Sequence, residues 1–149
     1  MPHAHILIIL ETKILCARQV DAIISAEVPD PTTQPLLHAI VSKNMIHKPC
    51  DLNAAAGCRV KGKGRCFRRY PKTMHASTTT NGDGYPQYRR RGRFTTRVDN
   101  RIVTDDWVVP HNPYLLMRFN CHVNVEVFDL YMLGEYLSIL ICMISGEQP

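Results

Sequence analysis

A basic stretch at positions 47–101 is the feature that most constrains how this sequence can fold. Between Arg59 and Arg101 lie 13 of the 18 basic residues and only two acidic ones, so this window carries +11 and the rest of the chain −6. Its first part, 47–71, places three cysteines and three glycines among basic residues, which is typical of a loop. We therefore expect a long, cysteine-containing basic insertion within one domain.

Apolar segments on either side of the insertion predict both strands and helices. Positions 3–10 (HAHILIIL) are typical of a buried strand, and positions 121–128, where valines alternate with polar residues, are typical of a half-buried one. A capping threonine at 32 or 33 and an apolar face at helical spacing predict a helix that ends near Met45. The apolar tail from Tyr136 to Ile144 is too short to span a bilayer. Together these patterns predict an α+β fold.

The uneven charge indicates an anionic partner, most simply single-stranded nucleic acid. Cations follow a phosphate backbone while aromatic rings stack on unpaired bases, and this region holds both kinds of side chain. The alternatives are a solvated basic loop and aromatic residues buried in a hairpin core. The candidate DNA-binding residues are Arg65, Arg68, Arg69, Lys72, Arg89, Arg90 and Arg91, beside the aromatic residues Phe67, Tyr70, Tyr85 and Tyr88.

His3 and His5 form a candidate site for a divalent cation such as Mg or Mn. Side chains alternate across a strand, so the two imidazoles lie on one face and can hold a metal with an open coordination position. The spacing also arises often by chance. Either His122 or Glu126 can supply a third ligand if their strand lies beside the first; the alternative is a polar, solvent-facing side of an edge strand.

A second candidate metal site lies within the insertion. Four soft or borderline ligands fall within twenty residues, and thiolates with an imidazole suit tetrahedral zinc. Such a zinc would order a loop that has too little apolar content to order itself. Three unpaired cysteines are the alternative. The candidate zinc ligands are His47, Cys50, Cys58 and Cys66.

Several long blocks of the sequence resemble one known family. MPHAHILIIL, DAIISAEVPDP, MIHKPC, GRCFRRYPK, DGYPQYRRR and DNRIVTDDWVVPHNPYLLMRFNCHVNVEV follow one another from about Pro2 to Val127. In order and rough spacing they are similar to the replication-initiator (HUH endonuclease) region of Helitron transposases. Chance is a poor explanation for blocks this long.

The resemblance implies a chemistry. Helitron transposases nick and join single-stranded DNA with a tyrosine nucleophile and a divalent metal, and they carry a DNA helicase domain in the same chain. The family's metal-binding histidines match His3 and His5. Its two tyrosines lie four residues apart on one helix face, and alignment of Glu135-Tyr136-Leu137 makes Tyr136 the candidate nucleophile, with Leu140 where the second tyrosine belongs. Packing of Tyr131 and Tyr136 in a scrambled tail is the alternative.

Departures from the family pattern limit what we expect of this chain. It begins at the metal-binding strand, so the antiparallel sheet should be incomplete and expose an edge and part of its core. The sequence has no GxxxxGK[ST] phosphate loop for ATP hydrolysis. We expect an α+β fold in which a partial initiator domain spans 1–127 and a divergent tail spans 128–149. The chain is then an intracellular, nuclear transposase fragment without membrane contact, and the alternative is a non-catalytic, zinc-clipped nucleic-acid-binding remnant.

Overall fold

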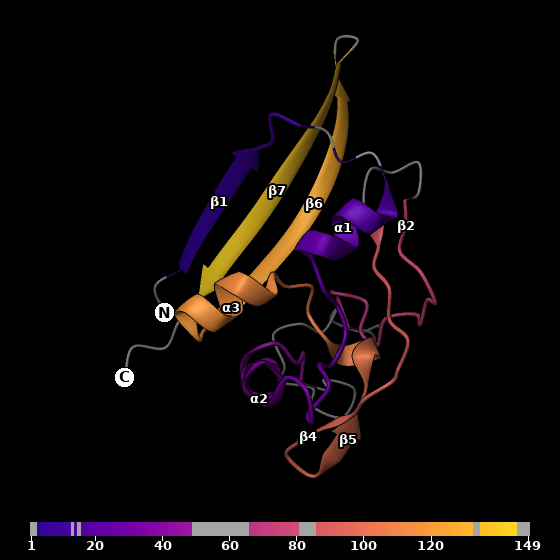
Figure 1. The fold of residues 1–149 in the computed structure, drawn as a ribbon, viewed down its shortest axis with the longest axis vertical. Helices are drawn as coiled ribbons and strands as arrows, with labels where there is room; N and C mark the ends of the chain where they lie inside the picture. Colours follow the sequence, from indigo (N-terminus) through magenta and orange to yellow (C-terminus); the bar gives the residue numbers. More distant parts are fainter. Residues whose placement is uncertain are drawn as a thin grey trace.

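A three-stranded antiparallel sheet forms one side of the molecule, and helices and short hairpins lie beside and below it (Figure 1). The computed structural model describes residues 3–12, 14, 16–48, 66–80, 86–132 and 135–145, and of residues 80, 129–132 and 135–138 it describes only the backbone. The described elements are β1 (His3–Ile9), α1 (Ala17–Ile23), α2 (Pro35–Asn44), β2 (Thr79–Thr80), β3 (Pro86–Gln87), β4 (Thr96–Val98), β5 (Arg101–Val103), the 3-10 turn η1 (Asp105–Trp107), α3 (Pro113–Phe119), β6 (His122–Met132) and β7 (Glu135–Ser145). The predicted α+β fold with an incomplete antiparallel sheet is confirmed.

The order of the strands is β1-β7-β6, so the last strand in sequence lies between the other two. Residue pairing places His3 opposite Ser145, and Ser145 opposite His122 on its other side. β6 continues past Val127 to Met132, and β7 begins at Glu135 and pairs with β6 along its whole length. The segment 128–149, predicted as a divergent tail, therefore supplies the central strand of the sheet.

The two faces of the sheet differ in character. Val123, Val125 and Val127 are at most 3% exposed and pack in the core with Cys142 of β7 and with residues of α1, α2 and α3. The alternate residues of β6 place His122, Asn124 and Glu126 on the opposite face. The alternation predicted for this strand is confirmed, and β6 itself has one apolar and one polar face.

The two edges of the sheet also differ. Along β6 the backbone N–H groups of the valines donate to the body of the protein: Val125 to the Pro110 carbonyl at 3.0 Å and Val127 to the Tyr88 hydroxyl at 3.1 Å. Along β1, in contrast, the large apolar side chains from Ile6 to Ile9 are 41–68% exposed. β1 is therefore the exposed edge expected for an incomplete sheet, and the prediction that this strand is buried is wrong.

Helices α2 and α3 begin with recognisable signals. α2 has Pro35 in its first turn, buries Ile40 and Val41, and matches the helix predicted near 32–46. α3 follows Asn112, whose side-chain oxygen accepts the Leu115 N–H at 2.9 Å, and it ends at Asn120 in the left-handed region with φ 46°. Every helix in the described ranges is too short or too polar to cross a membrane.

Candidate nucleic-acid interface

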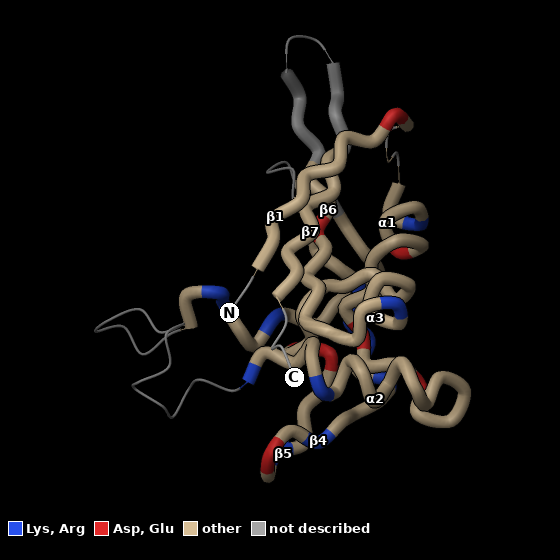
Figure 2. The backbone as a smooth tube through the Cα atoms, turned by 90° about the vertical axis from the view of Figure 1, so that its left-hand side faces the viewer, with Lys and Arg blue, Asp and Glu red and all other residues tan. Residues whose placement is uncertain are grey.

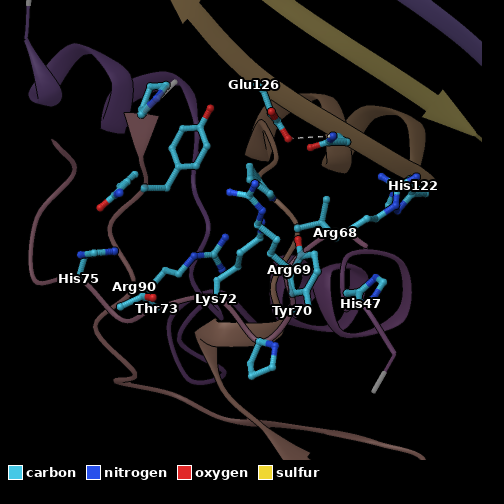
Figure 3. A pocket seen from close by; sticks show the side chains of 17 residues that line it. His47, Arg68, Arg69, Tyr70, Lys72, Thr73, His75, Arg90, His122 and Glu126 are labelled. Carbon is cyan, nitrogen blue, oxygen red and sulfur yellow. Dashed lines mark hydrogen bonds between the residues drawn. The ribbon is translucent and has the colours of Figure 1, made fainter. Parts of the chain in front are cut away.

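A cavity of about 860 Å³ lies between the polar face of β6 and the segments 68–75, 86–90 and 109–110 (Figure 3). We call it the basic pocket. Its volume is in the range of small-molecule and nucleotide sites. The charged and polar side chains that line it include Arg68, Arg69, Lys72, Arg90, His47, His75, His122, Asn124 and Glu126.

Backbone hydrogen bonds fix the segment that carries the pocket's exposed cations. The Arg69 N–H donates to the Cys66 carbonyl at 3.0 Å, closing a turn in which Arg69 has φ 57°. The Lys72 N–H then donates to the Asp106 carbonyl at 2.8 Å and ties the segment to η1. Arg68 and Arg69 are exposed, and Phe67 beside them is 76% exposed. The result is a held turn that presents one aromatic and two basic side chains to solvent.

Three rings form a nearly parallel cluster beneath this turn. The His47 and Tyr70 rings stack with centroids 4.3 Å apart and planes 19° apart, and Trp107 lies 6.3–6.4 Å from both. The Lys72 Nζ sits 4.9 Å from the centre of the Tyr70 ring, within the range of a cation–π contact. Burial raises the pKa of the Tyr70 hydroxyl to about 12. Tyr70 is therefore a neutral support for Lys72 rather than an acid or base.

The pocket has more cationic than anionic groups. In the ranges that the structure describes, neither Arg68, Arg69 nor Lys72 forms an ion pair. Burial lowers the pKa of Lys72, and the positive charge of Arg90 lowers it further. Burial, followed by the charges of Arg68 and Lys72, also lowers the pKa of His47. A bound anion such as a phosphate would offset the repulsion among these like charges and favour the charged forms of Lys72 and His47.

The three arginines at 89–91, which were predicted to bind DNA, contact acidic side chains and backbone carbonyls of the protein itself. Arg89 pairs with Asp21 at 2.9 Å and with Glu27 at 3.1 Å, and Arg91 pairs with Glu27 at 2.7 Å. Arg90 is 4% exposed and donates to the backbone carbonyls of Ala26, Asp105 and Val108. These side chains join the insertion to the N-terminal half, so carboxylates and carbonyls already offset their charge.

Basic positions elsewhere are partly offset too. Lys48 lies 3.9 Å from Asp99 at the turn between β4 and β5, where Figure 2 shows an acidic position in red. Arg65 lies outside the described residues. Of the predicted DNA-binding residues, the structure thus gathers Arg68, Arg69 and Lys72 as the cations available at the pocket.

The candidate divalent-metal ligands are only partly brought together. The His3 and His5 rings lie 5.4 Å apart on one face of β1, as expected. β7 separates them from β6, so His122 is two strand spacings from His3, about 9–10 Å between Cα atoms. Glu126 is farther along, in the row of Leu7 and Ile141. The condition for a third ligand from β6, that its strand lies directly beside His3 and His5, is therefore not met.

His122 also has a partner of its own. Its Nδ1 lies 2.8 Å from the Asn44 carbonyl, which requires the proton on Nδ1 and leaves Nε2 as the acceptor. Within the described ranges, no three His, Cys, Asp or Glu side chains are close enough to hold one metal ion. A metal at the pair of β1 histidines would take its remaining ligands from water or from bound phosphate.

Two of the four candidate zinc ligands lie close together. The Cys66 Sγ lies 3.3 Å from the His47 Nε2. Two ligands on one tetrahedral zinc, with Zn–S about 2.3 Å and Zn–N about 2.0 Å, are about 3.6 Å apart, so this pair has nearly the required spacing. Cys50 and Cys58 lie outside the described residues.

Tyr136 is placed far from the histidines. It lies in β7, paired with Tyr131 of β6, whereas the family resemblance implied a helix at this point. His5 is paired with Met143, seven residues further along β7, or about 24 Å at 3.4 Å per residue. The structure therefore does not bring the candidate nucleophile to the candidate metal ligands.

One residue of the ring cluster and one of the pocket had weak or no signals in the sequence. Trp107, the single tryptophan, follows two aspartates and gave no motif. Asn124 was visible only as a polar residue on the same strand face as His122 and Glu126. Tyr88 is 9% exposed and belongs to the core, as the hairpin-core alternative held.

Comparison of the chain with known protein families and with curated proteins finds no match.

Proposed function

We propose that this chain binds single-stranded DNA at the basic pocket and that it derives from a Helitron-type initiator protein. The observation that carries the binding proposal is the cluster of Arg68, Arg69 and Lys72 without carboxylate partners among the described residues, beside the exposed Phe67. Cations that track phosphates and a free ring that stacks on a base are the two requirements for holding a flexible single strand.

The proposed origin rests on the sequence blocks that resemble Helitron initiators. In that family the intact protein nicks and rejoins DNA, uses Mg or Mn, and continues into a helicase; such a protein works on DNA in the nucleus. In this chain about 24 Å separates Tyr136 from the row of His5 along β7. Transfer of a phosphate to a tyrosine needs the reacting atoms within about 3.5 Å of each other. We therefore propose a binding role without nicking for this chain.

Fluorescence anisotropy with a labelled dT oligonucleotide at several salt concentrations tests the proposal. Binding should weaken as salt increases, and each lost phosphate contact should reduce the slope of log K against log salt by about 0.7. Lys72→Ala and Arg68→Ala should each reduce this slope. Arg118→Ala, which removes an exposed arginine from α3, should leave the slope unchanged.

The aromatic contribution has its own matched pair. Phe67→Ala should weaken binding by about 1 kcal/mol or more, roughly fivefold, because a stacked base is lost. Phe119→Ala, at a ring that is 53% exposed on α3, should leave the affinity unchanged. Equal effects of both members of each pair, or binding that does not depend on salt, would overturn the proposal.

A further inference from the structure

Asn124 has an unused hydrogen-bond acceptor at the wall of the basic pocket. The residue is 4% exposed, and its Oδ1 has no partner in the described part of the chain. Its Nδ2 donates to the Glu126 Oε1 at 3.3 Å, the contact drawn as a dashed line in Figure 3. A buried acceptor without a partner is unfavourable in the free protein, so a ligand that supplies a donor here removes that penalty.

The orientation of this amide follows from its neighbour. A carboxylate only accepts hydrogen bonds, so the amide nitrogen of Asn124 must face Glu126 and the amide oxygen must be the unpaired atom. Asn124 and Glu126 are two residues apart on one face of β6. The pocket wall therefore presents two neighbouring acceptors, a carboxylate and an amide oxygen.

Acceptors in this arrangement distinguish the four bases by their Watson–Crick edges. Guanine has two adjacent donors, N1–H and the N2 amino group, which a carboxylate accepts side by side. Adenine and cytosine each offer one amino group next to a ring nitrogen that is itself an acceptor and is repelled by a carboxylate. Thymine places its single N–H between two carbonyl oxygens. Only guanine satisfies both pocket acceptors without an opposing pair.

We propose that the basic pocket selects an unpaired guanine, with Glu126 accepting from N1–H and the N2 amino group and with Asn124 Oδ1 accepting the second amino hydrogen. Arg68, Arg69 and Lys72 line the same cavity and would hold the flanking phosphates. The cavity of about 860 Å³ has room for a base with its sugar and phosphate. This selectivity rests on the proposed binding of single-stranded DNA.

Competition between short oligonucleotides tests the selectivity. The probes are dT decamers with one central dG, dA, dC or hypoxanthine, a base that keeps N1–H and lacks the amino group. The dG decamer should bind about tenfold tighter than the dA and dC decamers. The hypoxanthine decamer should lose several-fold of that advantage.

Two variants assign the selectivity to this corner of the pocket. Glu126→Gln and Asn124→Ala should reduce the preference for dG to less than twofold while the binding of plain dT decamer persists, which also shows that the variants are folded. Glu11→Gln removes the same charge ahead of α1 and should keep the preference.

Each outcome decides between the two proposals. Equal affinity for all decamers, with salt-dependent binding intact, overturns guanine selectivity and leaves the binding proposal standing. A dG preference that survives in both pocket variants places its cause elsewhere and overturns the assignment to Asn124 and Glu126. If no decamer binds at low salt, the proposed function fails and the selectivity fails with it.

Discussion

His111 should make the stability of this protein strongly dependent on pH. Its side chain is fully buried, its Nδ1 lies 3.0 Å from the Val109 carbonyl, and its Nε2 has no partner among the described residues. Burial, with a smaller effect from the nearby Arg90 charge, lowers its pKa from 6.5 to about 4. The folded protein therefore holds this imidazole neutral at a pH where the unfolded chain would protonate it.

The magnitude follows from the two pKa values. Between pH 6.5 and 4 the unfolded state binds more protons than the folded state, so stability is present above pH 6.5 and is lost as the pH falls. Each pKa unit corresponds to about 1.4 kcal/mol, which gives about 3 kcal/mol for complete protonation. About 2 kcal/mol of this should already be lost at pH 5, before most carboxylates titrate.

Urea unfolding followed by circular dichroism at pH 7.5 and pH 5 measures the effect. His111→Gln cannot titrate and keeps a donor for the Val109 carbonyl, so its free energy of unfolding should fall by about 2 kcal/mol less than that of the wild type over this interval. His38→Gln on α2 is the control and should follow the wild type. Parallel pH dependence in the wild type and His111→Gln would refute the reasoning.

Three other results are expected. Leu116→Ala, at a fully buried position of α3, should cost about 3 kcal/mol in urea unfolding, and an unchanged midpoint would contradict the core described above. If the predicted zinc clip forms, protein purified without chelator should contain about one equivalent of zinc that Cys66→Ser loses, whereas metal-free wild type would refute it. Incubation with single-stranded DNA and Mn should give no covalent adduct on a denaturing gel; an adduct that disappears in Tyr136→Phe would show that the tyrosine reaches the DNA after all.

Local patterns were sufficient for the elements whose signals are contained in their own residues. The strand predicted at 3–10 is β1, the helix predicted near 32–46 is α2, and the alternating segment 121–128 begins β6. In α2 and β6 one face lies against the core along the element, so periodicity reports them directly. The predicted cap of the helix is wrong, because α2 is preceded by Gln34, which makes no side-chain cap, rather than by Thr32 or Thr33.

β7 and the arginines at 89–91 show where local reasoning ends. A strand with neighbours on both sides can be apolar throughout, and the run from Tyr136 to Ile144 has no period that would mark it as a strand. The charge run at 89–91 suggested an external polyanion, but its partners Asp21 and Glu27 lie more than 60 residues earlier. Such pairings depend on the fold as a whole.

The central position of β7 has a consequence for how the protein is made. β1 pairs with β7, and residue 3 meets residue 145, so the first strand has no neighbour in the sheet until almost all of this sequence has left the ribosome. Closing so long a loop is slow compared with forming the β6–β7 hairpin, which joins adjacent residues. During that interval the apolar segment from Ile6 to Ile9 is exposed to other chains, so aggregation during synthesis should compete with folding at this strand above all.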